Sequence, residues 1–260
     1  MAPRIRNLRS VRRALLDWHA ARGMHAQWRE SGDPYQCLVA AVMAQQTQMS
    51  RVLPSYERFV AAFPTIESLA EATPGAVIRV WAGMGYNQRA VRLHRAARQI
   101  AADGWPRAAA ALVSIDGVGP FTAAIIASFA FGEAAACVDT NVRRVLGRLA
   151  GDEQIDGAAL QRLADASIAA ESPARWNQAL MDYGAQVCIA RPKCGECVVA
   201  RWCASREKFA APTRARAPGR KRATKRAQPF EGSARYYRGR IVDLLRALPP
   251  GESVALRRRP

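Results

Sequence analysis

Four of the six cysteines in this 260-residue chain lie in one short run, Cys188, Cys194, Cys197 and Cys203. Their spacing is C-x5-C-x2-C-x5-C, which places four sulfur ligands within sixteen residues. Four thiolates can surround one soft metal centre, and sulfur ligands of this kind select zinc or an iron–sulfur cluster. Zinc ribbons usually hold two close cysteine pairs far apart, which this spacing does not match. We predict a [4Fe–4S] cluster, with buried or disulfide-paired cysteines as the alternative.

A glycine-containing turn lies upstream of the cysteines, in the sequence Leu-Val-Ser-Ile-Asp-Gly-Val-Gly-Pro-Phe-Thr-Ala over 112–123. Gly117 and Gly119 allow a tight turn that approaches a phosphate closely, and the amides of the next helix then point at that anion. Such contacts hold a duplex without reading its sequence. An ordinary turn between helices is the alternative, but the preceding apolar stretch and the following Thr122 favour a DNA contact.

A third motif, Val138-Asp139-Thr140-Asn141, follows about twenty residues after the turn. Asp139 stands where a helix over 140–150 is expected to begin, and an aspartate there caps the helix for about 1 kcal/mol. The same carboxylate is also a candidate for chemistry, and capping and catalysis are compatible. We favour both roles.

The order of these three motifs resembles the DNA glycosylase superfamily that includes endonuclease III and the bacterial adenine DNA glycosylases. The resemblance runs from about Trp18 to Cys203. It implies an all-α fold of two helical domains with a DNA cleft between them. A six-helix barrel with a helix-hairpin-helix element would span 30–140, and the iron–sulfur domain would combine 1–29 with 141–205. The first cysteine loop departs from the relatives, with five intervening residues instead of six.

The resemblance also implies roles for individual residues. Asp139 would face a flipped nucleotide, stabilise the cation-like sugar and orient the attacking water, with Asn141 helping to orient either. Gln45 and Gln46 would fill the space left by the flipped base, and Tyr86 would wedge into a base step. The alternatives are exposed helix polar groups for the glutamines and ordinary packing for the tyrosine.

Two catalytic positions of the superfamily hold other residues here. The Schiff-base lysine of bifunctional relatives is replaced by Phe121, so we expect no conventional lyase step. The glutamate that protonates adenine is replaced by Ala41, although Asp33 and Glu30 lie upstream and are possible substitutes. A general acid typically contributes about 10²–10⁴-fold, and adenine is a poor leaving group.

These residues together predict a monofunctional base-excision DNA glycosylase. Its expected substrates are uracil or thymine opposite guanine, or hypoxanthine, because these bases leave more readily than adenine. One alternative is an adenine glycosylase acting opposite 8-oxoguanine or guanine with a different acid. Another is a DNA-lesion-binding protein with little catalysis.

The composition is consistent with a polyanionic partner. The net charge is +18, from 39 Lys and Arg against 21 acidic residues, which favours nucleic acid, although a general preference for Arg and Ala would explain part of it. No apolar run is long enough to cross a bilayer, and the basic N-terminus lacks the apolar segment of a secretory signal. We expect a cytoplasmic monomer with reduced cysteines.

Helical periodicity dominates the chain. It predicts helices over 9–22, 35–62 with a break near Pro54, 66–72 ending at Pro74-Gly75, 87–102, the hairpin at 110–131, and 140–150, 157–170 and 174–183. Cys37 and Cys137 are expected to be buried. A basic linker is expected over 206–228, and a small helical segment over 229–260 with an apolar stripe that docks on the protein. The members of the stripe are Tyr237, Ile241, Leu244, Leu245 and Leu248.

Overall fold

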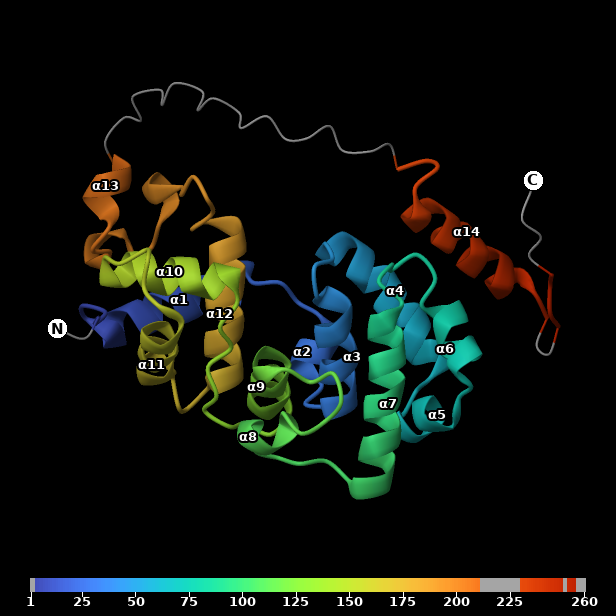
Figure 1. Ribbon diagram of the computed structural model, residues 1–260. Coiled ribbons are helices and arrows are strands. Elements are labelled where there is room, and N and C mark those ends of the chain that lie inside the picture. Colours follow the sequence, from blue (N-terminus) through green and yellow to red (C-terminus); the bar gives the residue numbers. More distant parts are fainter. Residues whose placement is uncertain (1–2, 211–229, 250–251, 256–260) are drawn as a thin grey trace.

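The computed structural model describes residues 3–210, 230–249 and 252–255. Within those ranges the chain is helical and contains no strand, which confirms the predicted all-α class (Figure 1). The helices are α1 Leu8–Arg22, α2 Gln27–Glu30, α3 Pro34–Ala44, α4 Met49–Ala62, α5 Ile66–Glu71, α6 Pro74–Val80, α7 Gln88–Asp103, α8 Ala109–Leu112, α9 Pro120–Ala130, α10 Thr140–Ala150, α11 Gly157–Ser167, α12 Pro173–Gln186, α13 Arg206–Ala210 and α14 Ala234–Ala247. Most of the expected basic linker over 206–228 lies outside the described residues.

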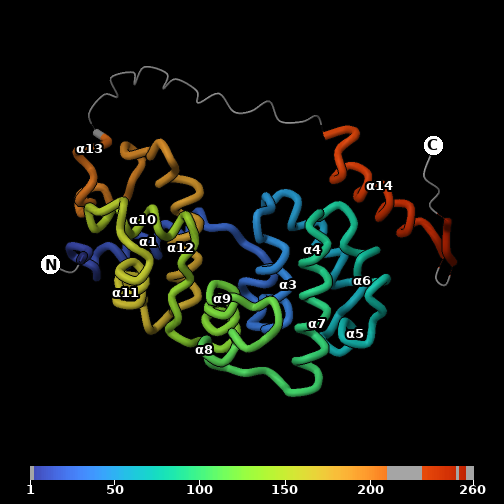
Figure 2. Tube along the Cα trace, viewed as in Figure 1, coloured from blue at the N-terminus to red at the C-terminus, as the bar shows by residue number. Residues whose placement is uncertain are grey.

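The interior consists of two clusters of buried apolar side chains. One cluster gathers residues of α2 to α9, from Ala26 to Cys137. The other joins one face of α1 to residues between Ala136 and Val199. The chain trace shows the corresponding groups of helices side by side, with α1 and α10–α13 in one group and α3–α9 in the other (Figure 2). The two predicted helical units are therefore present, while their boundary residues stay a prediction.

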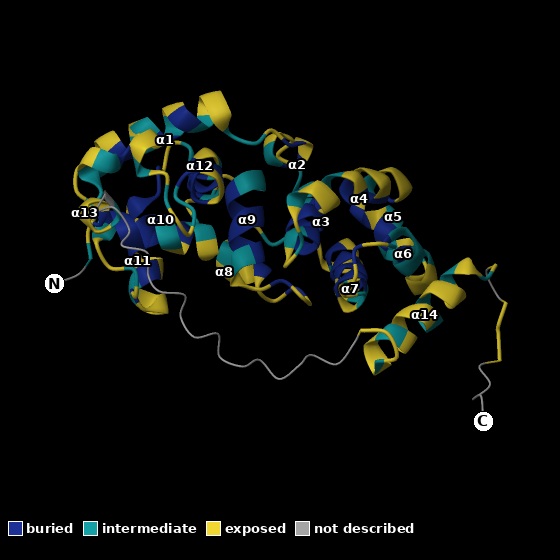
Figure 3. Ribbon diagram, turned by 90° about the horizontal axis from the view of Figure 1, so that it is seen from above, coloured by how far each residue is buried: buried dark blue, intermediate teal, exposed yellow. Residues whose placement is uncertain are grey.

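Helix α1 is separated from its packing partners by more than a hundred residues of sequence. The rings of Trp18 on α1 and Tyr183 on α12 meet edge to face, with centroids 4.8 Å apart. The Arg12 guanidinium donates hydrogen bonds to the carbonyls of Ser167 at 2.8 Å and Ile168 at 2.6 Å. These contacts close the second core with the N-terminal helix, which passes across α12 in Figure 3.

Helix α12 is the element through which the two units meet, because it packs against α1, α10 and α9. Its Asn177 side chain is 1% exposed. The amide nitrogen donates to Ser128 Oγ and to the Ala135 carbonyl, both at 2.9 Å, and the amide oxygen accepts from the Cys137 amide at 3.0 Å. One buried side chain thus holds α9 and the extended segment that leads to Asp139.

One turn further along α12, the Asp182 carboxylate binds the segment between α1 and α3. It accepts two hydrogen bonds from the Arg29 guanidinium, at 2.8 and 3.0 Å, and one from the Met24 amide at 2.8 Å. The His19 ring lies 3.4 Å from it. Burial raises the pKa of Asp182, but the hydrogen bonds from His19 and Arg29 and the Arg29 charge outweigh it and lower the pKa to about 2.

The prediction of a helix break near Pro54 is wrong. The break falls between Ala44 and Met49, and Pro54 lies inside α4. The physical reason is that the guanidinium of Arg89 occupies the carbonyls of Val42 and Met43 at the end of α3, at 3.1 and 3.0 Å. The last turn of α3 is thereby capped from another helix.

The Pro74-Gly75 pair also differs from expectation, because it begins a helix instead of only ending one. Pro74 is the first residue of α6, and the Thr73 side chain caps that helix by accepting from the Ala76 amide at 3.2 Å. A proline suits this position because the first helical amide needs no partner and its φ is already helical.

Both isolated cysteines are buried as predicted, with Cys37 and Cys137 at 0% exposure. Burial raises the pKa of the Cys37 thiol to about 12. None of the described helices combines the length and the apolar character needed to cross a membrane.

The C-terminal helix α14 forms as predicted but does not bury its apolar stripe. Tyr237, Leu244 and Leu245 are exposed, and α14 contains no buried residue. Polar contacts hold it instead, because the Arg246 guanidinium donates to the Asn87 side-chain oxygen at 2.9 Å and to the Ile78 carbonyl at 3.2 Å. The exposed character of α14 contrasts with the buried α9 and α10 in Figure 3.

We predict that Asp182→Asn lowers the free energy of unfolding at pH 7 by about 3 kcal/mol, because it leaves the Arg29 guanidinium buried without a counter-charge. Since the folded carboxyl titrates near pH 2 and an unfolded one near 3.8, this stabilisation is complete above about pH 4. It declines as the pH falls towards 2. Urea titrations of both proteins across this pH window measure the difference.

The matched control is Asp17→Asn, which removes the exposed ion pair with Arg13 at 3.9 Å. Exposed pairs contribute little, so this variant should unfold like the wild type. Equal stability of the Asp182 and Asp17 variants would contradict the role given to Asp182.

Candidate active site and cysteine run

The Asp139 carboxylate is fixed by three hydrogen bonds at the start of α10. One oxygen accepts from the amides of Asn141 at 2.9 Å and Val142 at 2.7 Å, which is the capping role that the sequence predicts. The other oxygen accepts from the Asn141 side-chain amide at 3.0 Å. Asp139 is half-buried, so the protein orients its carboxylate without enclosing the whole residue.

Asn141 in turn is held by Arg144, one turn further along α10. The Arg144 guanidinium donates to the Asn141 side-chain oxygen at 2.7 Å, to the Gly184 carbonyl at 2.5 Å and to the Cys188 carbonyl at 2.6 Å. A continuous chain of hydrogen bonds therefore runs from Asp139 to the first cysteine of the run. Sequence analysis did not single out Arg144, although its position three residues after Asn141 places both on one face of α10.

Gly184 allows α12 to approach this part of α10. A Cβ atom at Gly184 would lie 2.6 Å from the Asn141 Cβ and 2.9 Å from the Asn141 carbonyl oxygen. No side chain fits at that distance, so only glycine permits the contact. Close helix packing thus fixes the backbone of Asn141, while Arg144 fixes its side chain.

The turn over 113–119 has the geometry of a candidate anion site. Gly117 adopts φ 78°, a conformation that favours glycine, and Gly119 caps α9 with φ −82°, which any residue can adopt. A Cβ atom at Gly117 would also lie 2.8 Å from the Arg92 Cβ, so α7 passes close to the turn. Thr122 is 2% exposed, so its side chain points into the protein and the residue as a whole offers little surface to DNA.

Two surface loops carry the other candidate DNA contacts. The loop after α3 contains Gln45 and Gln46, and the loop before α7 contains Tyr86. Gln46 has φ 53° and Tyr86 has φ 47°, and the Tyr86 side chain is 60% exposed. Left-handed backbone costs a non-glycine residue roughly 1–2 kcal/mol, so the surroundings must enforce it.

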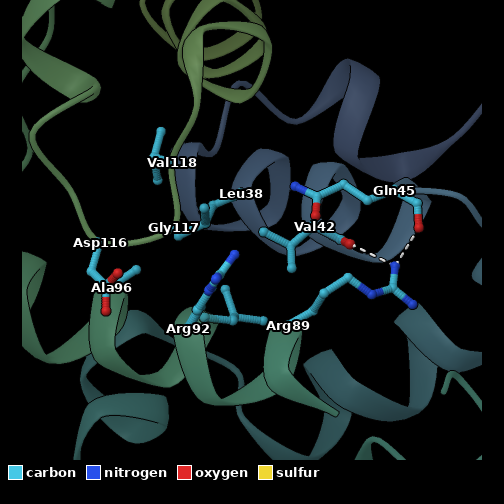
Figure 4. A pocket seen from close by; sticks show the side chains of 10 residues that line it. Leu38, Val42, Gln45, Arg89, Arg92, Ala96, Asp116, Gly117 and Val118 are labelled. Atoms are coloured by element: carbon cyan, nitrogen blue, oxygen red, sulfur yellow. Dashed lines mark hydrogen bonds between the residues drawn. The ribbon is translucent and has the colours of Figure 1, made fainter. Parts of the chain in front are cut away.

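Arg89 is the residue that joins these two loops. Its guanidinium, 9% exposed, lies between the two loops. Figure 4 shows it reaching from α7 to the carbonyl groups of Val42 and Gln45. The bonds that it donates go to the carbonyls of Val42, Met43, Gln45 and Met84 and to the Thr47 hydroxyl, at 3.1, 3.0, 2.6, 3.2 and 3.3 Å respectively.

Arg89 also lies beneath the aromatic residue of the second loop. Its guanidinium carbon is 5.5 Å from the ring centroids of both Trp81 and Tyr86. No role for this arginine follows from the sequence, because most of the groups that it binds are more than forty residues away on α3 and the loop after it. Burial lowers the pKa of Arg89. The five oxygen acceptors that it binds nevertheless suit a positively charged guanidinium held between the loops.

The two positions that lack superfamily catalytic residues are both enclosed. Ala41 lies on α3 within the first core, at 9% exposure. Phe121 packs partly buried against the same core. Of the upstream acids, Asp33 caps α3 by accepting from the Tyr35 amide at 2.8 Å, and Glu30 pairs with the exposed His25 at 2.9 Å.

The cysteine run folds as a compact loop against the second core. None of the four cysteines forms a disulfide. Burial raises the pKa of the Cys203 thiol, and the other three thiols of the run lie near enough to add to that increase. Arg148, 5% exposed, donates to Cys188 Sγ at 3.5 Å and to the carbonyls of Ile189 at 2.7 Å and Ala190 at 3.1 Å.

The donor set of this loop suits a soft metal centre, because four unpaired thiols with one guanidinium beside them match what an anionic sulfur cluster requires. As the side chains stand, no three Cys, His, Asp or Glu groups in the described part of the chain are placed to hold a metal ion.

Comparison with known proteins agrees with this organisation. The family model described as HhH-GPD superfamily base excision DNA repair protein matches residues 39–167. The adenine DNA glycosylase of Mycobacterium tuberculosis (strain ATCC 25618 / H37Rv) is 38% identical over 243 residues, covering 90% of this chain and 77% of that protein. The adenine DNA glycosylase of Homo sapiens is 35% identical over 222 residues, covering 76% of this chain and 40% of that protein.

Solved structures share the fold. The structure of a thermostable thymine-DNA glycosylase matches with a TM-score of 0.73 and 28% identity, covering 77% of this chain and 97% of that one. A trapped endonuclease III–DNA covalent intermediate matches with a TM-score of 0.64 and 22% identity, covering 78% of this chain and 98% of that one. The second likeness bears on the fold alone.

We predict that Arg89→Met releases both surface loops, because five oxygen acceptors lose their common donor. The free energy of unfolding should fall by about 2 kcal/mol, as expected when buried polar groups lose their partners. Hydrogen–deuterium exchange should accelerate at the amides of 45–48 and 83–87 and stay unchanged in α10. Arg98→Met, on an exposed turn of the same helix, is the control and should exchange like the wild type. Unchanged loop protection in Arg89→Met would refute this role.

Proposed function

The chain belongs to the HhH-GPD superfamily of base excision DNA repair proteins, and we propose that it is a DNA glycosylase that hydrolyses the N-glycosidic bond of a damaged or mismatched base in duplex DNA. The observation that carries this proposal is the Asp139 carboxylate, which three hydrogen bonds orient on a residue that is only half-buried. A carboxylate held in this way can stabilise positive charge where it develops, without reorganising during the reaction.

In the proposed reaction the target nucleotide leaves the base stack and enters the site. The loops carrying Gln46 and Tyr86 occupy the vacated space, and the amides after Gly117 hold a backbone phosphate. As the glycosidic bond breaks, the sugar gains cation character that Asp139 stabilises. A water molecule then attacks the sugar carbon, and Asp139 accepts its proton. Asn141 keeps the carboxylate turned towards the sugar.

The proposed activity is monofunctional. Phe121 occupies the position of the superfamily's Schiff-base lysine and has no amine, so no imine to the sugar can form there. The expected product is an intact abasic strand, which breaks only after treatment with alkali or heat.

The base preference follows from Ala41. A methyl group at this position cannot donate a proton to a leaving base, and Asp33 and Glu30 are engaged in other contacts. Bases that leave without strong acid assistance are therefore the preferred substrates, namely uracil or thymine opposite guanine, or hypoxanthine. The likeness to a thymine-DNA glycosylase structure is in keeping with this preference.

Adenine opposite 8-oxoguanine or guanine is the second candidate substrate. The observation in its favour is that the curated relatives similar to this chain are named adenine DNA glycosylase. That activity would need an acid other than residue 41.

A [4Fe–4S] cluster held by the four cysteines of the run completes the proposal. When bound, it would crosslink the 188–203 loop through four metal–sulfur bonds and take no part at the glycosidic bond. Arg148 beside Cys188 Sγ supplies a hydrogen bond and a positive charge of the kind that stabilises anionic sulfur.

Asp139→Asn should reduce the single-turnover rate of base release by about 100-fold or more, because the isostere keeps the shape and the helix cap but loses the charge. Lesion binding should stay close to that of the wild type. The control is Asp156→Asn, which alters the capping residue of α11, whose side chain accepts from the Ala159 amide at 2.8 Å. A similar loss in both variants would mean that capping, and not catalysis, explains the result.

The base preference is tested with duplexes that carry uracil or thymine opposite guanine, hypoxanthine, or adenine opposite 8-oxoguanine. We expect faster release of the first three, and strand breaks only after alkali. Ala41→Glu should raise adenine release. Rapid adenine release by the wild type, undiminished in Asp139→Asn, would contradict the proposed site, and binding without release of any base would leave a lesion-binding protein.

The purified protein should be yellow-brown and contain about four iron atoms per chain. Cys197→Ser should lose the colour and unfold at lower temperature, because one of four ligands is missing. Cys137→Ala removes a buried thiol outside the run and should keep its iron. Stoichiometric zinc in a colourless protein would contradict the cluster assignment.

A further inference from the structure

Helix α14 is attached to the loop that carries the candidate wedge residue. The Arg246 guanidinium donates to the side-chain oxygen of Asn87, at 2.9 Å, and Asn87 directly follows Tyr86. A second bond to the Ile78 carbonyl, at 3.2 Å, fixes α14 against α6. Segments far apart in sequence are therefore held together beside the same loop (Figure 1).

An open groove lies between α14 and the first helical unit. Its inner wall is formed by the two loops around Gln46 and Tyr86, and its outer wall is formed by one face of α14. We call this the α14 groove. The exposed aromatic ring of Tyr86 and the left-handed Gln46 lie within it, so any ligand that meets Tyr86 also faces α14.

The α14 groove is strongly cationic. Six arginines line it against a single aspartate, Asp243, which Arg246 already binds at 3.1 Å. Arg89 and Arg51 are bonded to loop carbonyls, so their charges are fixed in the inner wall. An excess of fixed positive charge around an exposed aromatic ring fits a polyanion whose bases can stack, which is a nucleic acid.

Two arginines of α14 are bound less firmly, since the Arg238 guanidinium donates within its own helix to the Ala234 carbonyl at 3.1 Å, and the Arg235 guanidinium lies 5.9 Å from the Phe230 ring centroid. Arg235 and Arg238 are exposed on the groove side, and neither makes an ion pair within the described residues. They are three residues apart on a helix, so they project from the same face. Arg240 is equally exposed on α14 but does not line the groove.

We infer that α14 is a second wall of the DNA-binding surface, and that Arg235 and Arg238 bind backbone phosphates of the duplex that Tyr86 contacts. The inference rests on the proposed function, because it takes the partner of the Tyr86 loop to be duplex DNA. Contacts of this kind add affinity and fix the position of the duplex but do not select a base. The chemistry at Asp139 is therefore left unchanged.

The test compares Arg235→Ala/Arg238→Ala with Arg240→Ala. Binding of an undamaged labelled duplex is measured by fluorescence anisotropy over a range of salt concentrations. Each lost phosphate contact should reduce the magnitude of the log–log salt slope by about 0.9, so the double variant should lose about 2 and Arg240→Ala should lose much less. Thermal melting should be unchanged in both, since the substituted side chains are exposed.

Equal salt slopes in the double variant and Arg240→Ala would overturn the inference. A lower single-turnover rate of base release by the double variant, measured with saturating enzyme, would also overturn it. Residues that only bind phosphates should not change that rate. The proposed function fails separately, if the wild type releases no base from any lesion duplex. A slope change in the double variant would then still support the α14 groove as a duplex-binding surface.

Discussion

A carboxylate removed from water needs its counter-charge to stay in place, and Asp182 keeps the Arg29 guanidinium and the His19 ring beside it only when three helices are packed together. Arg29 follows α1 in the chain, His19 lies on α1 itself, and Asp182 lies on α12. Helix α12 also carries Asn177, whose amide holds α9 and the segment before Asp139. Separating the two helical units would expose or unpair all of these groups. Their mutual position is therefore set by a few buried polar contacts between two apolar cores.

This constraint matters because the candidate site draws on both units. The carboxylate of Asp139 belongs to the start of α10 in the second unit, whereas the Gln46 and Tyr86 loops and the hairpin belong to the first. A nucleotide turned out of a duplex must meet elements from both sides at once. Small rotations between the units would move Asp139 relative to the Gln46 and Tyr86 loops. The polar contacts of α12 therefore also set the geometry of the candidate site.

Within the second unit, hydrogen-bonded side chains connect the cysteine run to the Asp139 carboxylate. Asp139 caps α10, Asn141 orients Asp139, and Arg144 joins Asn141 to the Cys188 carbonyl. Gly184 brings α12 close enough for this arrangement. A change in the loop that begins at Cys188 therefore reaches the carboxylate through two hydrogen-bonded side chains, without any direct contact between the two sites.

The sequence by itself determined the helical class, the buried Cys37 and Cys137, and the cap at Asp139, because periodicity and capping are local properties of the chain. The sequence also revealed the four-cysteine run, the hairpin and the Val-Asp pair, since the residues of each motif are close together in the chain. Local sequence signals gave the wrong prediction where a residue distant in sequence determined the backbone conformation. Proline chemistry predicts a helix break near Pro54, but the chain breaks at 45–48, where the Arg89 guanidinium from α7 binds the carbonyls at the end of α3. Only the tertiary structure showed where the Arg89 guanidinium binds, that Arg246 attaches α14, and that the apolar stripe of α14 is exposed. Each of these depends on partners that are far away in the sequence.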